Sequence, residues 1–208
     1  MNNEQKKIPV KIVIVGGNLI GKTNVTFHFI NHDFIQQHFE SNSVQYYTKL
    51  INCLNKNLRF DIWDTVGNVR YRNLNKIFYK DANICLLLFD LTNLDSLDDV
   101  DYYYNEIKLN NYENCCMILV GNKCDDIENR KIFKKDIKQL KEKYKIPYFE
   151  ISCKNGRNIK ELEYFICRSR IQNTINDDIE DNQNVIQYNQ YFKIKKQSNR
   201  VQKKCFIF

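Results

Sequence analysis

A glycine-rich loop near the N-terminus carries the clearest chemical signal of the chain. Residues 16–23 read Gly-Gly-Asn-Leu-Ile-Gly-Lys-Thr and fit the pattern G-x-x-x-x-G-K-S/T, directly after an apolar run. In such a loop the backbone N–H groups surround phosphates, the lysine reaches the β- and γ-phosphates, and the threonine hydroxyl coordinates Mg²⁺. The pattern predicts a nucleoside triphosphate site. The residues expected at its phosphate end are Gly16, Gly17, Asn18, Leu19, Ile20, Gly21, Lys22, Thr23 and Asn24.

A second motif could complete this phosphate site. The stretch Trp63-Asp64-Thr65-Val66-Gly67 ends another apolar run. An aspartate at the end of a strand beside a phosphate loop can hold Mg²⁺, often through water. Gly67 would offer a backbone N–H to the γ-phosphate. Taken alone, this motif is equally explained by a strand-ending turn.

A third motif, Asn122-Lys123-Cys124-Asp125, indicates which base is bound. The Asp125 carboxylate can accept hydrogen bonds from N1–H and the amino group of guanine, whereas adenine presents an acceptor at N1. A polar mismatch of this kind discriminates by ~10⁴ or more. Asn122 can brace the phosphate loop, and the aliphatic stem of Lys123 can pack over the base.

A fourth stretch, Ser152-Cys153-Lys154, follows the last apolar run. A backbone N–H from this stretch could bind the guanine carbonyl. Of the four motifs it is the least specific by itself.

These motifs need a scaffold that brings their strand ends together. Near-continuous apolar runs alternate with amphipathic stretches, which predicts an α/β domain with a mainly parallel, six-stranded sheet and about five helices on its two faces. Ligands of such sheets bind at the carboxyl ends of the strands. The expected strands are 10–15, 48–54, 58–63, 84–90, 116–121 and 147–151, and the expected helices are 22–31, 70–80, 97–109, 133–145 and 159–175.

Length and charge divide the 208 residues into one domain and a tail. We expect the domain over residues 1–175 and a flexible, basic tail over 176–208, with a helix around 184–192 as the alternative for part of it. The net charge of +7 is moderate, and much of it lies near the C-terminus, so nucleic acid is not an expected partner. Eight cysteines without a C-x-x-C pair indicate a reducing compartment and no zinc site. Cys85, inside an apolar run, is expected in the core.

The joint occurrence of the four motifs, in this order and each at a strand end, resembles the small Ras-like GTPases. Within them the chain is most similar to the Rab branch, because Trp63 precedes Asp64 and the interval from Asn122 to Ser152 leaves no room for the extra helix of Rho proteins. The resemblance covers about residues 8–172. It implies a P-loop G domain that binds GTP or GDP with Mg²⁺ and changes conformation between the two states.

The resemblance also assigns roles to individual positions. Phe34 matches the aromatic residue that stacks on guanine, with a core phenylalanine as the alternative. Ser41 matches the hydroxyl residue of the first switch, with Ser43 as a less favoured choice. The implied metal ligands are Thr23, Ser41 and Asp64, and the implied catalytic residues are Lys22, Gly67 and Asn68.

Several positions depart from the family pattern. Asn68 stands where the family usually has the glutamine that orients the attacking water, and a displacement of ~1 Å can cost ~10²-fold in rate. Val66 replaces the usual alanine, and Asn18 and Leu19 replace small residues of the phosphate loop. These departures predict weak intrinsic hydrolysis.

The C-terminus reads Lys203-Lys204-Cys205-Phe206-Ile207-Phe208, a C-a-a-X box that favours geranylgeranylation of Cys205. One lipid rarely anchors a protein stably, and nearby basic residues can supply the second signal on an anionic membrane. These basic residues are Lys193, Lys195, Lys196, Arg200, Lys203 and Lys204.

The resemblance therefore implies a Rab-like switch in vesicle traffic, on the cytoplasmic face of an intracellular membrane and with a cytosolic pool. Its implied protein partners are an exchange factor, an activating protein, a dissociation inhibitor or escort, and effectors. One alternative is a GTP-binding scaffold without an effective hydrolysis cycle. A metabolic P-loop kinase is a further alternative, but no arginine-rich lid is evident and Asp125 would be unexplained.

Overall fold

The computed structural model describes residues 7–31, 43–111 and 115–177. The chain divides into one unit that ends at Arg170 and a second that begins at Ile171. The first unit contains the whole sheet and the sites discussed below. The second contributes described residues only over the end of the last helix.

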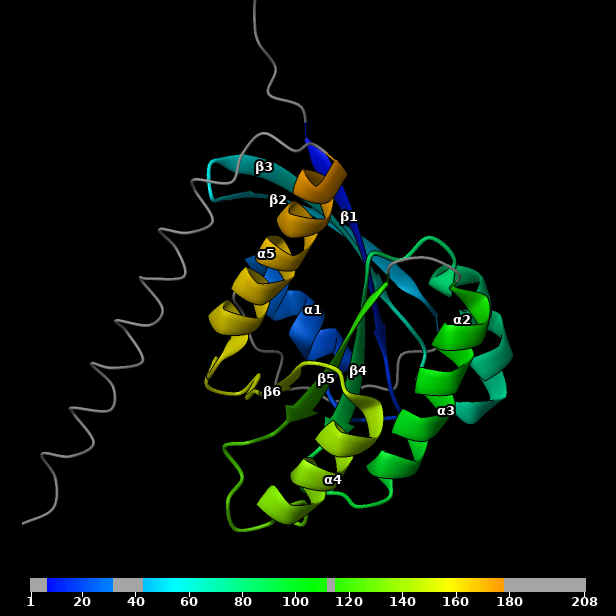
Figure 1. The fold of residues 1–208 in the computed structure, drawn as a ribbon. Coiled ribbons are helices and arrows are strands. Elements are labelled where there is room, and N and C mark those ends of the chain that lie inside the picture. Colours follow the sequence, from blue (N-terminus) through cyan, green and yellow to red (C-terminus); the bar gives the residue numbers. More distant parts are fainter. Residues whose placement is uncertain (1–6, 32–42, 112–114, 178–208) are drawn as a thin grey trace, which may run out of the picture. The chain divides into compact units, whose positions relative to one another are not determined.

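Six strands form one sheet in the order β2-β3-β1-β4-β5-β6 (Figure 1). All neighbours are parallel except β2 and β3, which form an antiparallel hairpin at one edge. Leu54 and Asn55 form the hairpin turn with φ of 51° and 58°, the left-handed conformation that suits two-residue hairpin turns. The strands are β1 (Ile8–Val15), β2 (Gln45–Cys53), β3 (Lys56–Asp64), β4 (Ile84–Asp90), β5 (Cys116–Asn122) and β6 (Tyr148–Glu150).

The described residues also form five α-helices and one short 3₁₀ helix, of which α5 follows the last strand. In Figure 1, α1 and α5 lie on one face of the sheet, and α2 and α3 lie on the other. The ring of Tyr144 in α4 contacts that of Tyr104 in α3, with centroids 4.7 Å apart, which places α4 on the α3 side. The helices are α1 (Lys22–Asn31), η1 (Val69–Tyr71), α2 (Arg72–Tyr79), α3 (Ser96–Asn110), α4 (Lys134–Tyr144) and α5 (Ile159–Asp177).

The predicted α/β fold class is confirmed, with every expected strand and helix present. Strand β4 is buried at all seven positions, because it lies between β1 and β5 and is covered on both faces. Cys85 in this strand is fully buried, as predicted.

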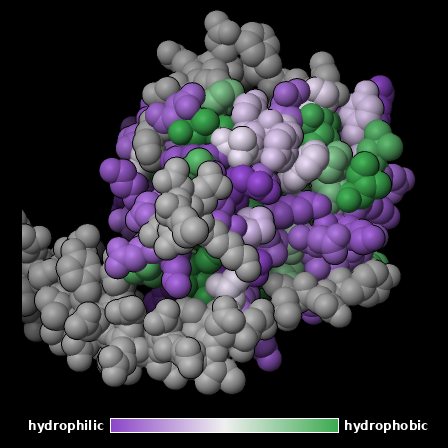
Figure 2. Space-filling view, turned by 90° about the horizontal axis from the view of Figure 1, so that it is seen from above, coloured by the Kyte–Doolittle hydropathy of each residue, from purple (hydrophilic) through white to green (hydrophobic). Residues whose placement is uncertain are grey.

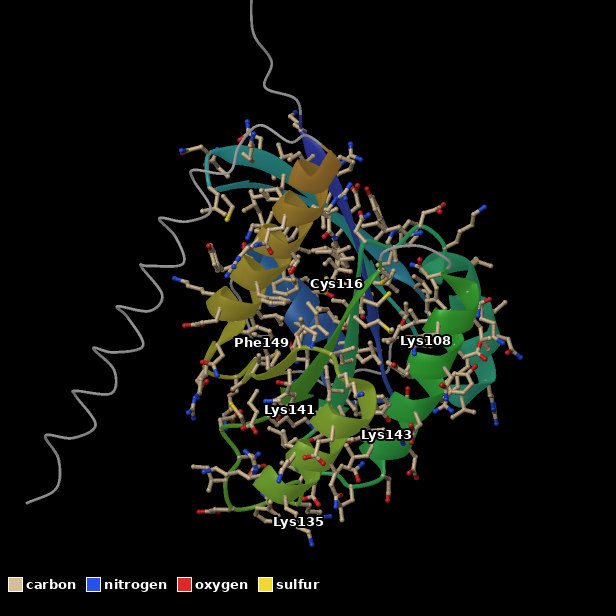
Figure 3. The ribbon with its side chains drawn as sticks, viewed as in Figure 1. Lys108, Cys116, Lys135, Lys141, Lys143 and Phe149 are labelled. Carbon is tan, nitrogen blue, oxygen red and sulfur yellow. The ribbon has the colours of Figure 1, made fainter. Side chains whose placement is uncertain are left out.

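Helices α3 and α5 each bury one apolar face against the sheet. In α3, Val100, Tyr103 and Ile107 are buried, and Tyr104 packs at the margin of the core. In α5, Ile166 lies in the core, and Phe165 packs on Phe149 of β6, with ring centroids 5.2 Å apart. Figure 3 labels Phe149 on its strand.

Hydrophilic and hydrophobic side chains both lie on the surface of the described domain. Figure 3 shows lysines on the outer side of α4, and Figure 2 shows hydrophobic residues in separate groups between hydrophilic ones. No helix in the described part of the chain is long and apolar enough to span a membrane.

The strand register aligns the chemically active motifs. Ile14 of β1 pairs with Asp64 of β3, and Asp90 of β4 pairs with Asn122 of β5. The carboxyl ends of four strands therefore meet at one edge of the sheet, which is where the sequence places the motifs.

Candidate nucleotide-binding site

The phosphate loop runs from the end of β1 to the first residue of α1. Gly16 and Gly21 have φ of +144° and +96°, backbone conformations that residues with a side chain rarely adopt. A Cβ on Gly16 would collide with the Ile20 side chain and with Leu88 O, and one on Gly21 would collide with the Asn122 amide. The two outer glycines of the motif are therefore required by the backbone and its close packing.

Lys22 begins α1 and is only 6% exposed. Its Nζ donates a hydrogen bond to Gly17 O at 2.6 Å. Burial lowers the pKa of Lys22 to about 8, and the carboxylates of Asp64 and Asp99 oppose this shift. A buried ammonium with a single carbonyl partner is suited to a bound phosphate, which would satisfy its remaining donors.

A pair of oxygen-bearing side chains lies next to this lysine. Thr23 Oγ1 donates to Asp64 Oδ2 at 2.6 Å. Asp64 is fully buried, and its Oδ1 has no hydrogen-bond partner in the described structure. Burial raises the pKa of Asp64, while Thr23 and Lys22 act in the opposite direction. An unpartnered buried carboxylate oxygen beside a hydroxyl is an oxygen donor set that fits Mg²⁺.

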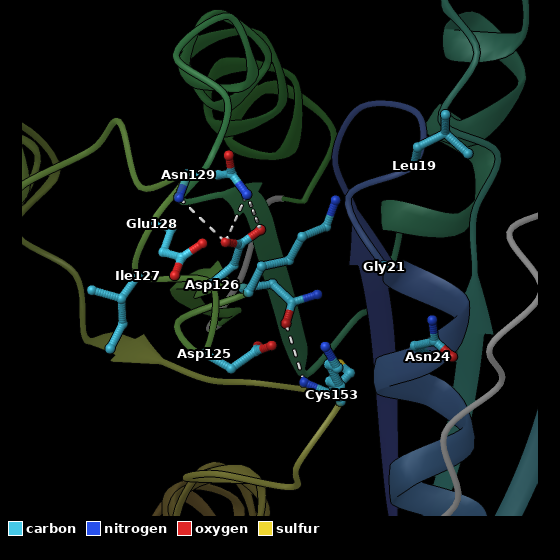
Figure 4. A pocket seen from close by; sticks show the side chains of 12 residues that line it. Leu19, Gly21, Asn24, Asp125, Asp126, Ile127, Glu128, Asn129 and Cys153 are labelled. Carbon is cyan, nitrogen blue, oxygen red and sulfur yellow. Dashed lines mark hydrogen bonds between the residues drawn. The ribbon is translucent and has the colours of Figure 1, made fainter.

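A hollow of about 690 Å³ extends from the phosphate loop to the loop after β5 (Figure 4). The Asp125 side chain lines it. The lining contains eight of the residues predicted to contact nucleotide: Leu19, Gly21, Asn24, Asn122, Lys123, Asp125, Cys153 and Lys154. Four neighbours complete the wall, and none of them was predicted: Asp126, Ile127, Glu128 and Asn129.

Asn122 ties three loops together at the base of the hollow. Its Nδ2 donates to Ile20 O of the phosphate loop at 2.8 Å, and its Oδ1 accepts from the backbone N–H of Cys153 at 3.3 Å. The phosphate loop, the loop of Asp125 and the loop after β6 are therefore held in one arrangement.

Two backbone N–H groups of the loop after β6 already donate hydrogen bonds within the protein. The N–H of Ser152 donates to Arg157 O, and that of Cys153 donates to Asn122. Both side chains are buried, whereas Lys154 is exposed at the rim. We therefore expect a hydrogen bond from this loop to a guanine carbonyl to come from the Lys154 N–H.

Gly67 and Asn68 follow the end of β3. A Cβ on Gly67 would collide with Gly17 O and Lys22 Nζ, so this segment packs directly against the phosphate loop. Asn68 is the N-cap of η1, where its Oδ1 accepts from the backbone N–H of Arg70 at 3.0 Å. Its amide is thus directed at its own helix.

Comparison with known proteins agrees with this geometry, since the Ras family model matches residues 11–172. The chain belongs to the Ras family. Rab-26 of Rattus norvegicus is 31% identical over 153 residues, which are 73% of this chain and 60% of that protein. Rab-1D of Dictyostelium discoideum is 32% identical over 168 residues, covering 80% and 81%, and the GTP-binding protein yptV5 of Volvox carteri is 30% identical over 179 residues, covering 83% and 87%. The matched part of the chain thus spans less than two thirds of the rat protein. The family model and these relatives together identify a divergent Rab-like small GTPase.

Sequence reasoning missed two acidic residues at the site of this Ras-family protein. Asp90, at the end of β4, accepts from Lys123 Nζ at 2.6 Å and so fixes the lysine expected to pack over the base. Its position after a fully apolar strand was a usable signal, because the other motifs share it. Asp99 of α3 lies beside the phosphate loop, and no local pattern marks it.

Three predicted positions lie outside the described residues. Phe34 and Ser41 fall within 32–42, and Cys205 falls within 178–208 together with the basic residues of the tail. Their roles remain predictions from the sequence. The alternative Ser43 is described, and its Oγ accepts from Gln45 Nε2 at 2.8 Å.

Proposed function

We propose that this chain is a guanine-nucleotide switch that binds GDP or GTP with Mg²⁺ and hydrolyses GTP slowly. One observation carries the proposal: Asp125 and the phosphate loop line a single hollow, and Asn122 bridges the loops that bear them. One nucleotide could occupy this hollow with its base at Asp125 and its phosphates at the phosphate loop. Family membership supports the same conclusion.

The base would be read by Asp125. Its carboxylate accepts from the N1–H and amino groups of guanine, and adenine would leave it facing a lone pair. Lys123, held by Asp90, presents its aliphatic stem to the base. The Lys154 N–H would donate to the guanine carbonyl.

The phosphates would be held by the loop, by Lys22 and by the residues suited to the metal. Mg²⁺ would neutralise charge on the β- and γ-phosphates when bound to Thr23, Asp64 and, as the sequence predicts, Ser41. Lys22 would exchange Gly17 O for phosphate oxygens. Gly67 packs against Gly17 and Lys22, and its N–H would donate to the terminal phosphate.

Slow hydrolysis follows from Asn68. Its side chain is shorter than the glutamine of the family, and it is occupied as the cap of η1. Leaving this cap to position water would cost about 1 kcal/mol. The same observation favours the second candidate, a GTP-binding scaffold without an effective hydrolysis cycle.

For the biological role we propose a Rab-like switch in vesicle traffic, anchored to the cytoplasmic face of a membrane by prenylated Cys205 and the basic tail. The support is the set of Rab-named relatives and the C-terminal sequence. Effectors and regulators would contact the segment after Gly67, where Val69, Leu74 and Ile77 expose 66%, 62% and 70% of their area.

Exchange of one carboxylate for an amide tests the base assignment. Asp125→Asn should weaken GDP binding strongly and favour xanthosine diphosphate, whose C2 carbonyl accepts from an amide N–H. Competition against a fluorescent guanine nucleotide measures both, and Asp98→Asn, the same change at an exposed position outside the hollow, is the matched control. Equal competition by ATP and GTP in the unmodified protein would contradict the proposal.

A further inference from the structure

An acidic side chain of α3 lies against the phosphate loop. Asp99 is in the first turn of α3, and a side chain on Gly17 would collide with its Oδ2. Asp99 also acts on Lys22, since its negative charge favours the protonated form of that lysine. The carboxylate is therefore close to the space in which a terminal phosphate would be held.

Arg72 holds this carboxylate from the opposite side. It is the first residue of α2, and its Nη2 donates to Asp99 Oδ1. The guanidinium lies over the rings of Tyr102 and Tyr103, at 4.7 and 5.6 Å from their centroids. The two charged side chains are only 19% and 21% exposed, so water screens them poorly.

The pair joins α2 to α3 at one end, and a second ion pair joins them further along. Lys76 Nζ lies 2.7 Å from Glu106 Oε2. Because α2 follows directly after Gly67, Asn68 and η1, Arg72 belongs to the segment that packs on the phosphate loop. Asp99 and Arg72 therefore form their ion pair at the place where the segment nearest the expected terminal phosphate contacts α3.

We infer that Asp99 and Arg72 determine the preference of this protein for GTP over GDP. The inference rests on the proposed function. GTP carries one more phosphate than GDP, and that phosphate would add negative charge next to Lys22 and Gly17. The Asp99 carboxylate disfavours this added charge, and the Arg72 guanidinium offsets it. Asp99 is therefore a specificity-determining residue for the nucleotide state, and its effect depends on its arginine partner.

Two substitutions with opposite charge effects test this inference. Asp99→Asn keeps the shape and removes the negative charge, so the ratio of GTP-analogue affinity to GDP affinity should rise about threefold to tenfold. Arg72→Gln leaves the carboxylate unbalanced, so the ratio should fall by a similar factor. The double variant should return towards the unmodified protein. All affinities are measured with Mg²⁺ on the full chain, at low and at high salt.

The matched control is Asp98→Asn, which makes the same charge change at an exposed neighbour in α3. Its ratio should stay within twofold of the unmodified protein. Using the ratio within each variant cancels any general loss of binding caused by altered stability.

The directions in which the two substitutions shift the affinity ratio distinguish an electrostatic role of the ion pair from a merely mechanical one. If Asp99→Asn and Arg72→Gln shift the ratio in the same direction, the pair acts only as a latch on α2, and the inference is overturned. Unchanged ratios, or an equal shift in Asp98→Asn, overturn it as well. Failure of the unmodified protein to bind either guanine nucleotide would instead refute the proposed function.

Discussion

At the scale of single residues, several side chains of the site are already engaged by the protein. Asn68 caps η1, Lys22 donates to Gly17, and Thr23 donates to Asp64. Two of these contacts would be replaced by stronger, charge-assisted contacts to phosphate and metal. No contact to phosphate or metal would replace the cap that Asn68 forms. We therefore expect GTP hydrolysis to be weak and nucleotide binding to be unaffected.

We therefore expect Asn68→Gln to accelerate GTP hydrolysis by about tenfold or more, since the longer amide reaches the attacking water. Single-turnover conversion of bound GTP measures this rate. Asn73→Gln, on α2 but outside the predicted site, makes the same change in length and should leave the rate unaltered. No gain from Asn68→Gln would show that water placement is not limiting.

The backbone conformation of Leu19 leads to a separate prediction, which concerns stability. It has φ of +59° in the phosphate loop, a conformation that costs a non-glycine residue about 1 kcal/mol or more. Its side chain is 54% exposed, so little packing offsets the strain. Leu19→Gly should therefore raise the free energy of unfolding by about 1 kcal/mol in denaturant titration.

The control for this prediction is Leu94→Gly. Leu94 is 50% exposed and is not among the residues with positive φ, so glycine should destabilise the protein there. Equal effects of the two substitutions would remove the strain argument.

At the scale of elements, the segment that carries Asp125 is fastened to β6 by one arginine. Arg130 donates from Nη1 and Nη2 to the two oxygens of Glu150, at 2.9 and 2.8 Å, and from Nε to Ile132 O at 2.7 Å. This bidentate pair fixes the loop after β5 against the sheet. Arg130 and the Tyr148 hydroxyl lower the pKa of Glu150, although burial acts against them.

Arg130→Ala should reduce the free energy of unfolding by about 1–2 kcal/mol at pH 7 and weaken guanine-nucleotide binding. A carboxylate whose pKa is lowered by folding contributes stability that is present above its unfolded pKa of about 4.5 and is lost as pH falls. The difference between the two proteins should therefore shrink on acidification below pH 4.5. Lys131→Ala is the control, and a difference that grows on acidification would contradict this account.

The elements themselves could be predicted because their signals are local. Period and apolarity defined each strand and helix, and the carboxyl-end rule for parallel sheets placed the motifs at one edge. The segment 70–80 was predicted as one helix but divides into η1 and α2, because the backbone of Tyr71, with φ of −104° and ψ of 3°, departs from α-helical geometry, which the apolar pattern does not report.

The rest of the site depends on contacts between distant residues. Asn122 reaches Ile20 across 102 positions, and Arg72 reaches Asp99 across 27. The bridging role of Asn122 was accessible only because its motif is recognisable. Asp99 stands in an ordinary acidic first turn of a helix, so only the packing of α3 beside the phosphate loop gives it meaning.

At the scale of the whole molecule, a nucleotide-dependent switch requires that one part of the fold responds to the terminal phosphate and that the remainder does not. The responsive part is residues 66–79, which pack on Lys22 and Gly17 through Gly67 and on α3 through Arg72 and Lys76. Helix α4 has no such connection to the phosphate loop among the described contacts. It therefore serves as an internal reference.

Amide hydrogen exchange of the full chain, loaded with GDP or with a slowly hydrolysed GTP analogue in the presence of Mg²⁺, tests this requirement most directly. We expect exchange over residues 66–79 to differ between the two states, while exchange over α4 stays the same. Identical exchange over residues 66–79 in the two states, with both nucleotides shown to be bound, would contradict the claim that this protein is a nucleotide-dependent switch.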